Sequence, residues 1–183
     1  MVGGGGIGRA LRQQLAARCP ALDVTLVTRC PTTNDEWPLD LESDDSLASL
    51  TDRLRDASQP LRLVFNATGR LHGPSIQPEK RLQQVQSAAL VESFRINAAG
   101  PLLLAKAIEP ALNRNQPFHF ASLSARVGSI GDNRSGGWYA YRSAKAAQNM
   151  MLRCLSLEWS RRFPMATVTV SYTHLRAHET GPY

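Results

Sequence analysis

The sequence predicts an α/β protein with a doubly wound parallel sheet and helices on both of its faces. Short apolar runs rich in β-branched residues alternate with helical patterns, and neither an internal repeat nor a low-complexity linker breaks the alternation. Strands that alternate with crossover helices pair in parallel, because each crossover returns the chain to the same end of the sheet. A chain of 183 residues is long enough to bury its own core, so we expect one domain, over residues 1–169.

The expected elements follow from local patterns in chain order. Apolar residues share one face of a helix that follows a glycine run and stops before Pro20. A cap near Ser43 or Asp44 begins a second helix, and Pro101 kinks or restarts a third. The expected strands cover residues 23–28, 37–41, 61–67, 117–124 and 165–170, and the expected helices cover residues 8–19, 43–56, 82–112 and 138–159.

The N-terminal segment combines a strand stub with a glycine run. Residues 1–2 cannot cross a sheet at about 3.3 Å per residue, so we expect a truncated first strand. The glycines that follow fit G-x-G-x-x-G between a strand and a helix, the arrangement with which a Rossmann-type fold binds the pyrophosphate of a dinucleotide. The residues expected to contact the cofactor there are Gly3, Gly5, Gly6, Ile7 and Gly8.

The end of the second strand predicts which dinucleotide is preferred. A fold selective for NAD(H) usually places Asp or Glu there, on the ribose hydroxyls. This chain has Thr28 and Arg29 instead. A hydroxyl and a guanidinium can bind a 2′-phosphate that a carboxylate would repel, so we expect NADP(H) to be preferred over NAD(H).

Composition and charge argue against several other classes of protein. The formal net charge is +6, but the basic residues are scattered without interleaved aromatic residues, so we expect no nucleic-acid partner. There is no long apolar run and no N-terminal secretion signal, which predicts a cytoplasmic protein without a membrane partner. The 3 cysteines contain no C-x-x-C pair, so neither disulfides nor a thiolate metal site are expected.

A phenol and an ammonium lie four residues apart in the last expected helix. Tyr141 and Lys145 therefore share one helix face and can reach the same cleft. A nearby Lys⁺ favours the phenolate, so we expect a lowered Tyr141 pKa, as a general acid–base requires. Tyr139 is the competing phenol, but Ser143 lies four residues after it.

Taken together, the motifs resemble those of the short-chain dehydrogenase/reductase family. They are GGGGIG, N-A-T-G at residues 66–69, R-I-N at residues 95–97, a serine at a strand end, and Y-R-S-A-K at residues 141–145. Residues 124–150 are similar to the C-factor and sniffer-type carbonyl reductase branch. The resemblance implies an oxidoreductase that interconverts a carbonyl and an alcohol, with a small-molecule substrate. The alternative is a C-factor-like signalling or regulatory protein that binds the cofactor with little or no turnover.

The resemblance also implies roles for particular residues. Tyr141 would exchange a proton with the substrate oxygen. Lys145 would lower the pKa of Tyr141 and hold the nicotinamide ribose. Asn97 would shape the middle helix and hold a proton-relay water. The cofactor would also contact the pair Asp40 and Leu41 at the adenine and the turn formed by Asn66, Ala67, Thr68 and Gly69. Relatives usually form homodimers or homotetramers through helices that here include residues 102–111 and 146–159.

The substrate-binding serine is expected at the end of the fifth strand. The family often has a serine pair there and uses its second member, but this chain has Ser124 followed by Ala125. Ser124 is therefore our preferred candidate, with Ser129 and Ser122 as alternatives. The glycine run is also one residue shorter than in the family.

The C-terminal residues 170–183 are expected to be a non-native tail. The family continues after its sixth strand into a Pro-Gly turn and a seventh strand, but this chain has SYTHLRAHETGPY instead. The segment VSYTHLRAHET could suggest a metal site at His174 and His178. Its back-translation, however, resembles the end of an adapter used in transposase-based sequencing. We therefore expect no metal site, and a missing C-terminal strand.

Overall fold

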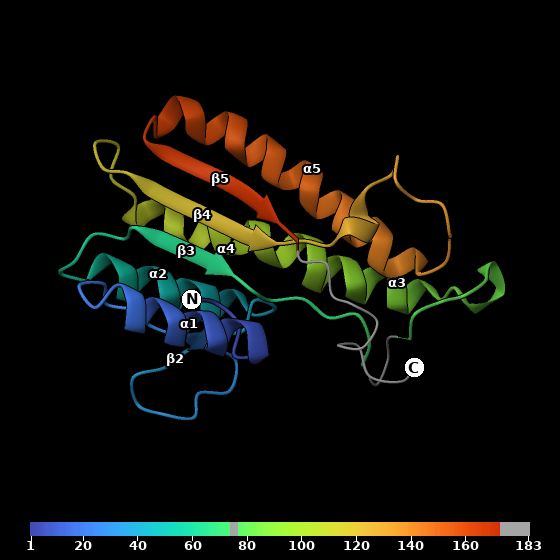
Figure 1. Cartoon of the computed structure of the whole chain (residues 1–183), viewed down its shortest axis with the longest axis horizontal. Helices are drawn as coiled ribbons and strands as arrows, with labels where there is room; N and C mark the ends of the chain where they lie inside the picture. The colour runs from blue at the N-terminus through green and yellow to red at the C-terminus, as the bar shows by residue number, and fades with distance from the viewer. Residues whose placement is uncertain (74–76, 173–183) are drawn as a thin grey trace.

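The computed structural model, which describes residues 1–73 and 77–172, contains the predicted parallel sheet (Figure 1). β1 (Val27–Thr28) pairs with β2 (Trp37–Pro38). β3 (Leu63–Asn66) pairs with β4 (Phe118–Leu123), which in turn pairs with β5 (Ala166–Ser171). All of these ladders are parallel, which confirms the predicted fold class.

Val2 lies between β1 and β3 and joins the two groups of strands. It forms parallel bridges with Val27 and with Asn66. Its N–H donates to the Phe65 carbonyl at 2.9 Å, and its carbonyl accepts from the Ala67 N–H at 2.7 Å. The order across the sheet is therefore β2, β1, Val2, β3, β4, β5, so a strand stub of this length is sufficient to connect the sheet.

Within the described residues, five α-helices connect the strands, with shorter helical segments between them (Figure 1). The α-helices are α1 (Gly6–Arg18), α2 (Asp44–Arg55), α3 (Ser87–Phe94), α4 (Gly100–Ile108) and α5 (Tyr139–Arg162). The segment η2 (Arg95–Ala99) is a π-helix, and the three 3₁₀ segments are η1 (Leu82–Gln84), η3 (Glu109–Ala111) and η4 (Arg126–Gly128). Ser43 caps α2 with its side chain, as predicted.

The main hydrophobic core lies between the sheet and the layer formed by α2, α4 and α5. Trp159 of α5 is fully buried there and packs edge-to-face on Phe118 and Phe120 of β4. α1 lies on the other face of the sheet. Successive residues of an extended strand point to opposite faces. Val27 points into the core, and the preceding Leu26 lines a hollow together with residues of α1. Helices therefore cover both faces of the sheet.

The strands are shorter than the apolar runs predicted. Residues 23–28 were expected to be a strand, but only Val27–Thr28 forms a ladder with β2. A ladder exists only where a partner backbone lies alongside. Val27 pairs with Trp37, the first residue of β2, and the residues just before Trp37 form a turn, so residues 23–26 have no partner strand there. The extent of a strand therefore depends on its neighbours as well as on its own residues.

The helix expected over residues 82–112 is divided into five segments. Pro101 stands at the start of α4, as a restart predicts. The irregular turn comes before it, in η2, where the Gly100 N–H donates to the Arg95 carbonyl five residues back. Proline has no N–H for the carbonyl of Asn97, so the α-helical pattern cannot continue through this point. Wider π turns of this kind often occur at functional sites.

Candidate functional site

The glycine run forms the turn that leads from Val2 into α1. Gly3 has a positive φ of 114°, and a Cβ atom on Gly8 would lie 1.9 Å from the Gly3 carbonyl oxygen. Both positions therefore require glycine. In contrast, nothing lies within 4 Å of a Cβ atom placed on Gly5 or Gly6. The turn is closed on its inner side and open on its outer side.

α1 begins at the open side of this turn. Gly5, its N-cap residue, has no side chain to cap the helix, and no acidic residue lies in the first turn. The first N–H groups of a helix lack intrahelical partners, and together with the positive end of the helix dipole they favour an anion. The half-exposed Ile7 follows at the same end. These residues fit the pyrophosphate of a dinucleotide.

Gly4 is a required glycine that the sequence motif does not identify. A Cβ atom on Gly4 would lie 2.3 Å from Thr28 Oγ1, so the turn could no longer lie against the end of β1. Arg9 holds the turn from the other side, donating from Nε to the Gly4 carbonyl at 3.0 Å and from Nη1 to the buried Glu36 at 2.6 Å. These contacts join segments distant in sequence, so motif spacing could not reveal them.

The predicted 2′-phosphate residues lie at the end of β1. Thr28 is buried with its hydroxyl toward Gly4, whereas the Arg29 side chain is 61% exposed. Arg29 Nη1 lies 3.7 Å from Glu42 Oε2. An exposed guanidinium with one distant counter-ion can turn toward a phosphate, so this position is compatible with NADP(H).

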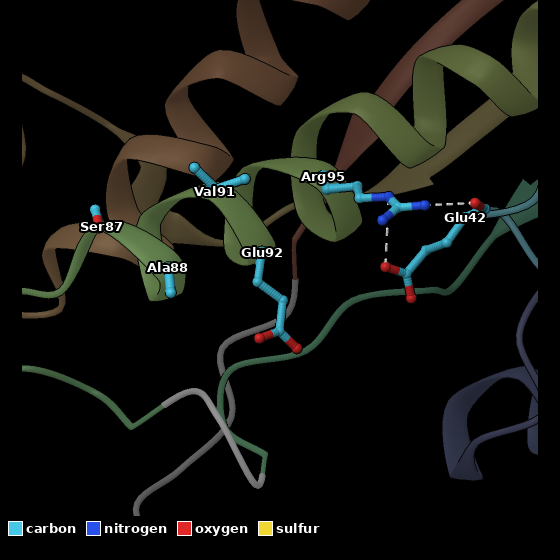
Figure 2. A pocket seen from close by; sticks show the side chains of 6 residues that line it. All are labelled: Glu42, Ser87, Ala88, Val91, Glu92 and Arg95. Atoms are coloured by element: carbon cyan, nitrogen blue, oxygen red, sulfur yellow. Dashed lines mark hydrogen bonds and ion pairs between the residues drawn. The ribbon is translucent and has the colours of Figure 1, made fainter.

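Glu42 also pairs with Arg95, as Figure 2 shows. Arg95 Nη2 donates to the Glu42 carbonyl at 2.6 Å. A hollow of about 390 Å³ lies beside this pair and is lined by Glu42, Ser87, Ala88, Val91, Glu92 and Arg95. None of the predicted site residues lines it.

Asp40 and Leu41 lie in the turn between β2 and α2. Asp40 Oδ1 accepts from the Glu42 N–H at 2.9 Å, and the Asp40 N–H donates to Ser46 Oγ at 2.9 Å. Leu41 packs against the core, and a Cβ atom on Gly100 would lie 3.5 Å from it. Both residues therefore shape this turn, and their contact with adenine stays a prediction.

The turn at residues 66–69 lies between the glycine turn and the expected catalytic residues. Asn66 is fully buried, and its Oδ1 accepts from the N–H and the hydroxyl of Thr68 at 3.1 and 2.7 Å. A Cβ atom on Gly3 would lie 3.1 Å from the Ala67 carbonyl carbon. A Cβ atom on Gly69 would lie 3.3 Å from both Asn97 Oδ1 and Lys145 Nζ. The fold thus brings these predicted residues together.

Asn97 lies in the π-helix and pins the chain that follows this turn. Its amide accepts from the Arg70 N–H and donates to the Arg70 carbonyl, both at 2.8 Å, and it also donates to Ser93 Oγ at 3.2 Å. A buried side-chain amide with these partners holds two backbone segments at a fixed separation. The local role expected of Asn97 is compatible with these contacts.

Tyr141 and Lys145 lie on one face of α5, with Lys145 Nζ 5.7 Å from the centroid of the Tyr141 ring. Burial lowers the pKa of Lys145 to about 8. Burial also raises the pKa of Tyr141 above its ordinary value, whereas we expected Lys145 to lower it. The expectation was wrong for this structure because the ammonium faces the ring and loss of hydration outweighs its field.

The three candidate serines lie in different surroundings. Ser122 is fully buried, and its Oγ accepts from Asn66 Nδ2 at 3.0 Å. Ser124 is partly buried and donates to Asn149 Oδ1 at 2.7 Å. Ser129 is exposed at the end of η4. Ser124 remains the candidate whose hydroxyl lies near the strand end without being enclosed in the interior.

Two buried residues near Tyr141 and Lys145 were missed by sequence reasoning. Glu79 is 3% exposed. Its carboxylate accepts from the Ala140 N–H at 3.3 Å, and its carbonyl accepts from the Trp138 N–H at 2.5 Å. Glu79 thus fastens the start of α5. Gln148, fully buried, bonds Lys145 Nζ at 2.9 Å. Its spacing of three residues from Lys145 on one helix was the available signal.

The arrangement has the parts needed to bind a dinucleotide and move a proton. A glycine turn with a free helix N-terminus lies at the carboxyl ends of parallel strands, where open α/β sheets bind ligands. A partly buried phenol and a buried ammonium come from the helix that follows β4. In the described ranges 1–73 and 77–172 there is no cluster of three metal-ligating residues; His174 and His178 lie outside them. Fold and site together define a Rossmann-type α/β domain whose glycine turn fits a dinucleotide.

Comparison with known proteins identifies the family. The family model for short chain dehydrogenase matches residues 1–180, and this chain belongs to the short-chain dehydrogenase family. The C-signal protein of Myxococcus xanthus is 40% identical over 77 residues, which are 42% of this chain and 46% of that protein. The 1-hydroxy-2-glutathionyl-2-methyl-3-butene dehydrogenase of Rhodococcus sp. (strain AD45) is 34% identical over 113 residues, 62% of this chain and 46% of that protein.

Solved structures agree with this assignment. The carbonyl reductase Sniffer of D. melanogaster superposes with a TM-score of 0.76 at 25% identity, over 92% of this chain and 77% of that one. The NADPH-bound carbonyl reductase from chicken fatty liver has a TM-score of 0.73 at 22% identity, over the same two shares. The predicted family and its C-factor and sniffer branch are thus confirmed. The chain spans about half the length of the curated relatives it matches.

The buried ammonium of Lys145 predicts a pH-dependent stability. Its pKa is about 8 in the folded chain and about 10.4 in an unfolded chain. Between these values the unfolded chain binds more protons, so the free energy of unfolding rises with pH, by about 2 kcal/mol from pH 7 to 9.5. Lys145→Met should lack this rise, measured by urea unfolding at both pH values.

Lys106→Met is the matched control, because Lys106 is exposed on α4 and its loss changes the net charge equally. This variant should keep the rise seen in the wild-type chain. A constant difference between the wild-type chain and Lys145→Met at the two pH values would contradict the burial of a charged ammonium.

Proposed function

We propose that the protein is an NADP(H)-dependent oxidoreductase that interconverts a carbonyl and an alcohol on a small molecule. The observation that carries the proposal is that Lys145 Nζ lies close to both Gly69 and the ring of Tyr141, with Asn97 Oδ1 beside the same glycine. When bound, the nicotinamide would supply or take up the hydride. The backbone at Gly5 and Gly6, with the turn at residues 66–69, would hold the cofactor.

Tyr141 is the proposed general acid–base. Because burial raises its pKa, the phenol stays protonated at neutral pH and can donate its proton to a carbonyl oxygen as negative charge develops there. Lys145 is mostly protonated at pH 7 with a pKa of about 8, so it can stabilise the phenolate that remains. Ser124 is the proposed second donor to the substrate oxygen.

NADP(H) is the proposed cofactor because Thr28 and Arg29 stand at the end of β1. Neither is acidic, and the Arg29 guanidinium is largely exposed. The two acidic side chains of the following loop are already bound, Asp35 to Arg12 and Glu36 to Arg9 and to the Thr32 N–H. The surroundings of Arg29 therefore suit a 2′-phosphate.

A C-factor-like role in signalling, with cofactor binding and little turnover, is the second candidate. The identity with C-signal of Myxococcus xanthus favours it. The change in the usual serine pair also favours it, since Ala125 stands in place of the second serine and the Ser124 hydroxyl already donates to Asn149. NADPH binding without turnover of aldehydes or ketones would support this candidate over the first.

The cellular compartment and the bounds of the domain are a further part of the proposal. None of the described helices is both long and apolar enough to cross a membrane, and we propose a cytoplasmic protein with residues 1–169 as its domain and residues 170–183 as a non-native tail. β5 continues through Ser171, and the tail's residues 173–183 lie outside the described part.

Replacement of the phenol tests the proposed reaction. Tyr141→Phe keeps the ring but removes the proton, so turnover should fall at least about 100-fold while NADPH affinity changes little. The measurement is NADPH oxidation at 340 nm with a panel of aldehydes and ketones. Tyr139→Phe, which alters an exposed phenol in the same turn, should keep full activity. Full activity in Tyr141→Phe would rule out the proposed acid–base.

Replacement of Arg29 tests the cofactor preference. Arg29→Ala should weaken NADPH binding about 10- to 100-fold, as expected for loss of a charged hydrogen bond to phosphate, and leave NADH binding unchanged. Arg62 lies just before the start of β3, away from the carboxyl ends of the strands. Arg62→Ala makes the same charge change and should affect neither NADPH nor NADH binding. Fluorescence titration gives both dissociation constants. Equal effects on NADPH and NADH would contradict a 2′-phosphate contact.

A homodimer or homotetramer is proposed through the neighbouring helices α3, α4 and α5. Exposed apolar side chains gather on α3 and α5, namely Val91, Phe94, Met150 and Leu157. Exposed apolar side chains on neighbouring helices can be buried between subunits. Sedimentation velocity should give at least twice the mass of one chain, and a monomer at micromolar concentration would contradict the proposal.

A further inference from the structure

Gln148 is a buried amide that the proposed reaction does not use. It lies in α5, three residues after Lys145, and is fully buried. A buried amide costs about 1–3 kcal/mol unless it is hydrogen-bonded. Its polar atoms must therefore have specific partners to make the residue tolerable at this position.

The amide of Gln148 links Lys145 to the end of β4. Lys145 Nζ donates to Gln148 Oε1 at 2.9 Å and to the Leu123 carbonyl at 3.1 Å. Gln148 Nε2 donates to Ser122 Oγ at 2.9 Å and to the same Leu123 carbonyl at 3.1 Å. An ammonium has three N–H donors, so these two acceptors fix its direction and leave one donor for a ligand.

The same network reaches the turn at residues 66–69. Ser122 Oγ accepts from Asn66 Nδ2, and Asn66 Oδ1 accepts from Thr68. Turning the Gln148 amide over would set its NH₂ group against the Lys145 ammonium, donor against donor. The amide orientation is therefore determined by the charge of Lys145 at one end and by Ser122 at the other.

We propose that Gln148 is a positioning residue for Lys145, holding the ammonium beside Gly69 and over the Tyr141 ring through the buried chain that includes Ser122 and Asn66. The proposal rests on the proposed function for the use made of the ammonium, but the positioning itself concerns only this chain. A residue that merely fills the core could be replaced by an apolar side chain of similar size at little cost to Lys145. A positioning residue could not.

Gln148→Met tests the proposal, because Met has a similar length and adapts to irregular interior space. Removing the Oε1 acceptor should displace the ammonium. The chain has only three lysines, Lys80, Lys106 and Lys145, so NMR of ¹³Cε-labelled lysine resolves each one, and Lys145→Met identifies its signal. We expect the Lys145 signal to shift and broaden in Gln148→Met, and NADPH affinity to fall roughly tenfold.

Thr51→Val is the matched control. It removes a partly buried hydrogen bond of 2.8 Å from Thr51 Oγ1 in α2 to the Ala107 carbonyl in α4. It should lower stability without shifting the Lys145 signal or changing NADPH affinity. If Gln148→Met does not fold, Gln148→Leu replaces it with the same expectation. A Lys145 signal at its wild-type position in a folded Gln148 variant would overturn the proposal.

The two proposals fail in different ways. If the wild-type chain does not bind NADPH, the proposed function is wrong, but the lysine spectrum still decides the role of Gln148. If NADPH binds and Gln148→Met leaves both the Lys145 signal and the affinity unchanged, only the positioning role is wrong.

Discussion

The backbone hydrogen bonds of Val2 are the constraint on which the rest of the structure depends. On one side Val2 is bonded to Phe65 and Ala67, and on the other the neighbouring Gly3 N–H donates to the Val27 carbonyl at 2.8 Å. These bonds set the glycine turn between the end of β1 and the turn at residues 66–69. The cofactor residues predicted from three separate motifs meet because a single residue joins their strands.

Sequence patterns predicted the parts of this fold that depend on local chemistry. The cap at Ser43, the restart at Pro101 and the alternation of strands and helices follow from side chains and backbone preferences close in sequence. The short ladder of β1 and the π turn before α4 could not be predicted in this way. The first depends on which backbone lies alongside, and the second on how the chain accommodates Pro101 while Asn97 bonds to Arg70.

The candidate site shows the same division. Tyr141, Lys145, Asn97 and the glycines could be named from motifs, because their spacing along one segment carries the chemistry. Gly4 and Glu79 could not, since each acts through a contact with a distant segment. Gln148 lies within one helical turn of Lys145, but its link to Ser122 of β4 is visible only in the fold. The direction of the Tyr141 pKa was also missed, because helical spacing places an ammonium near a phenol without saying how deeply both are buried.

The buried polar residues around Lys145 lower the stability of the fold while they hold a charged group in place. Asn66, Ser122, Gln148 and Lys145 occupy places where apolar side chains would pack without any desolvation cost. Hydrogen bonding offsets part of that cost, yet the pKa of Lys145 still falls to about 8, so the ammonium remains destabilised relative to water. A group held in this state gains more from a new hydrogen bond or a nearby phenolate than a hydrated one does. The same burial that keeps the Tyr141 proton in place thus leaves its neighbour ready to stabilise the anion formed when that proton departs.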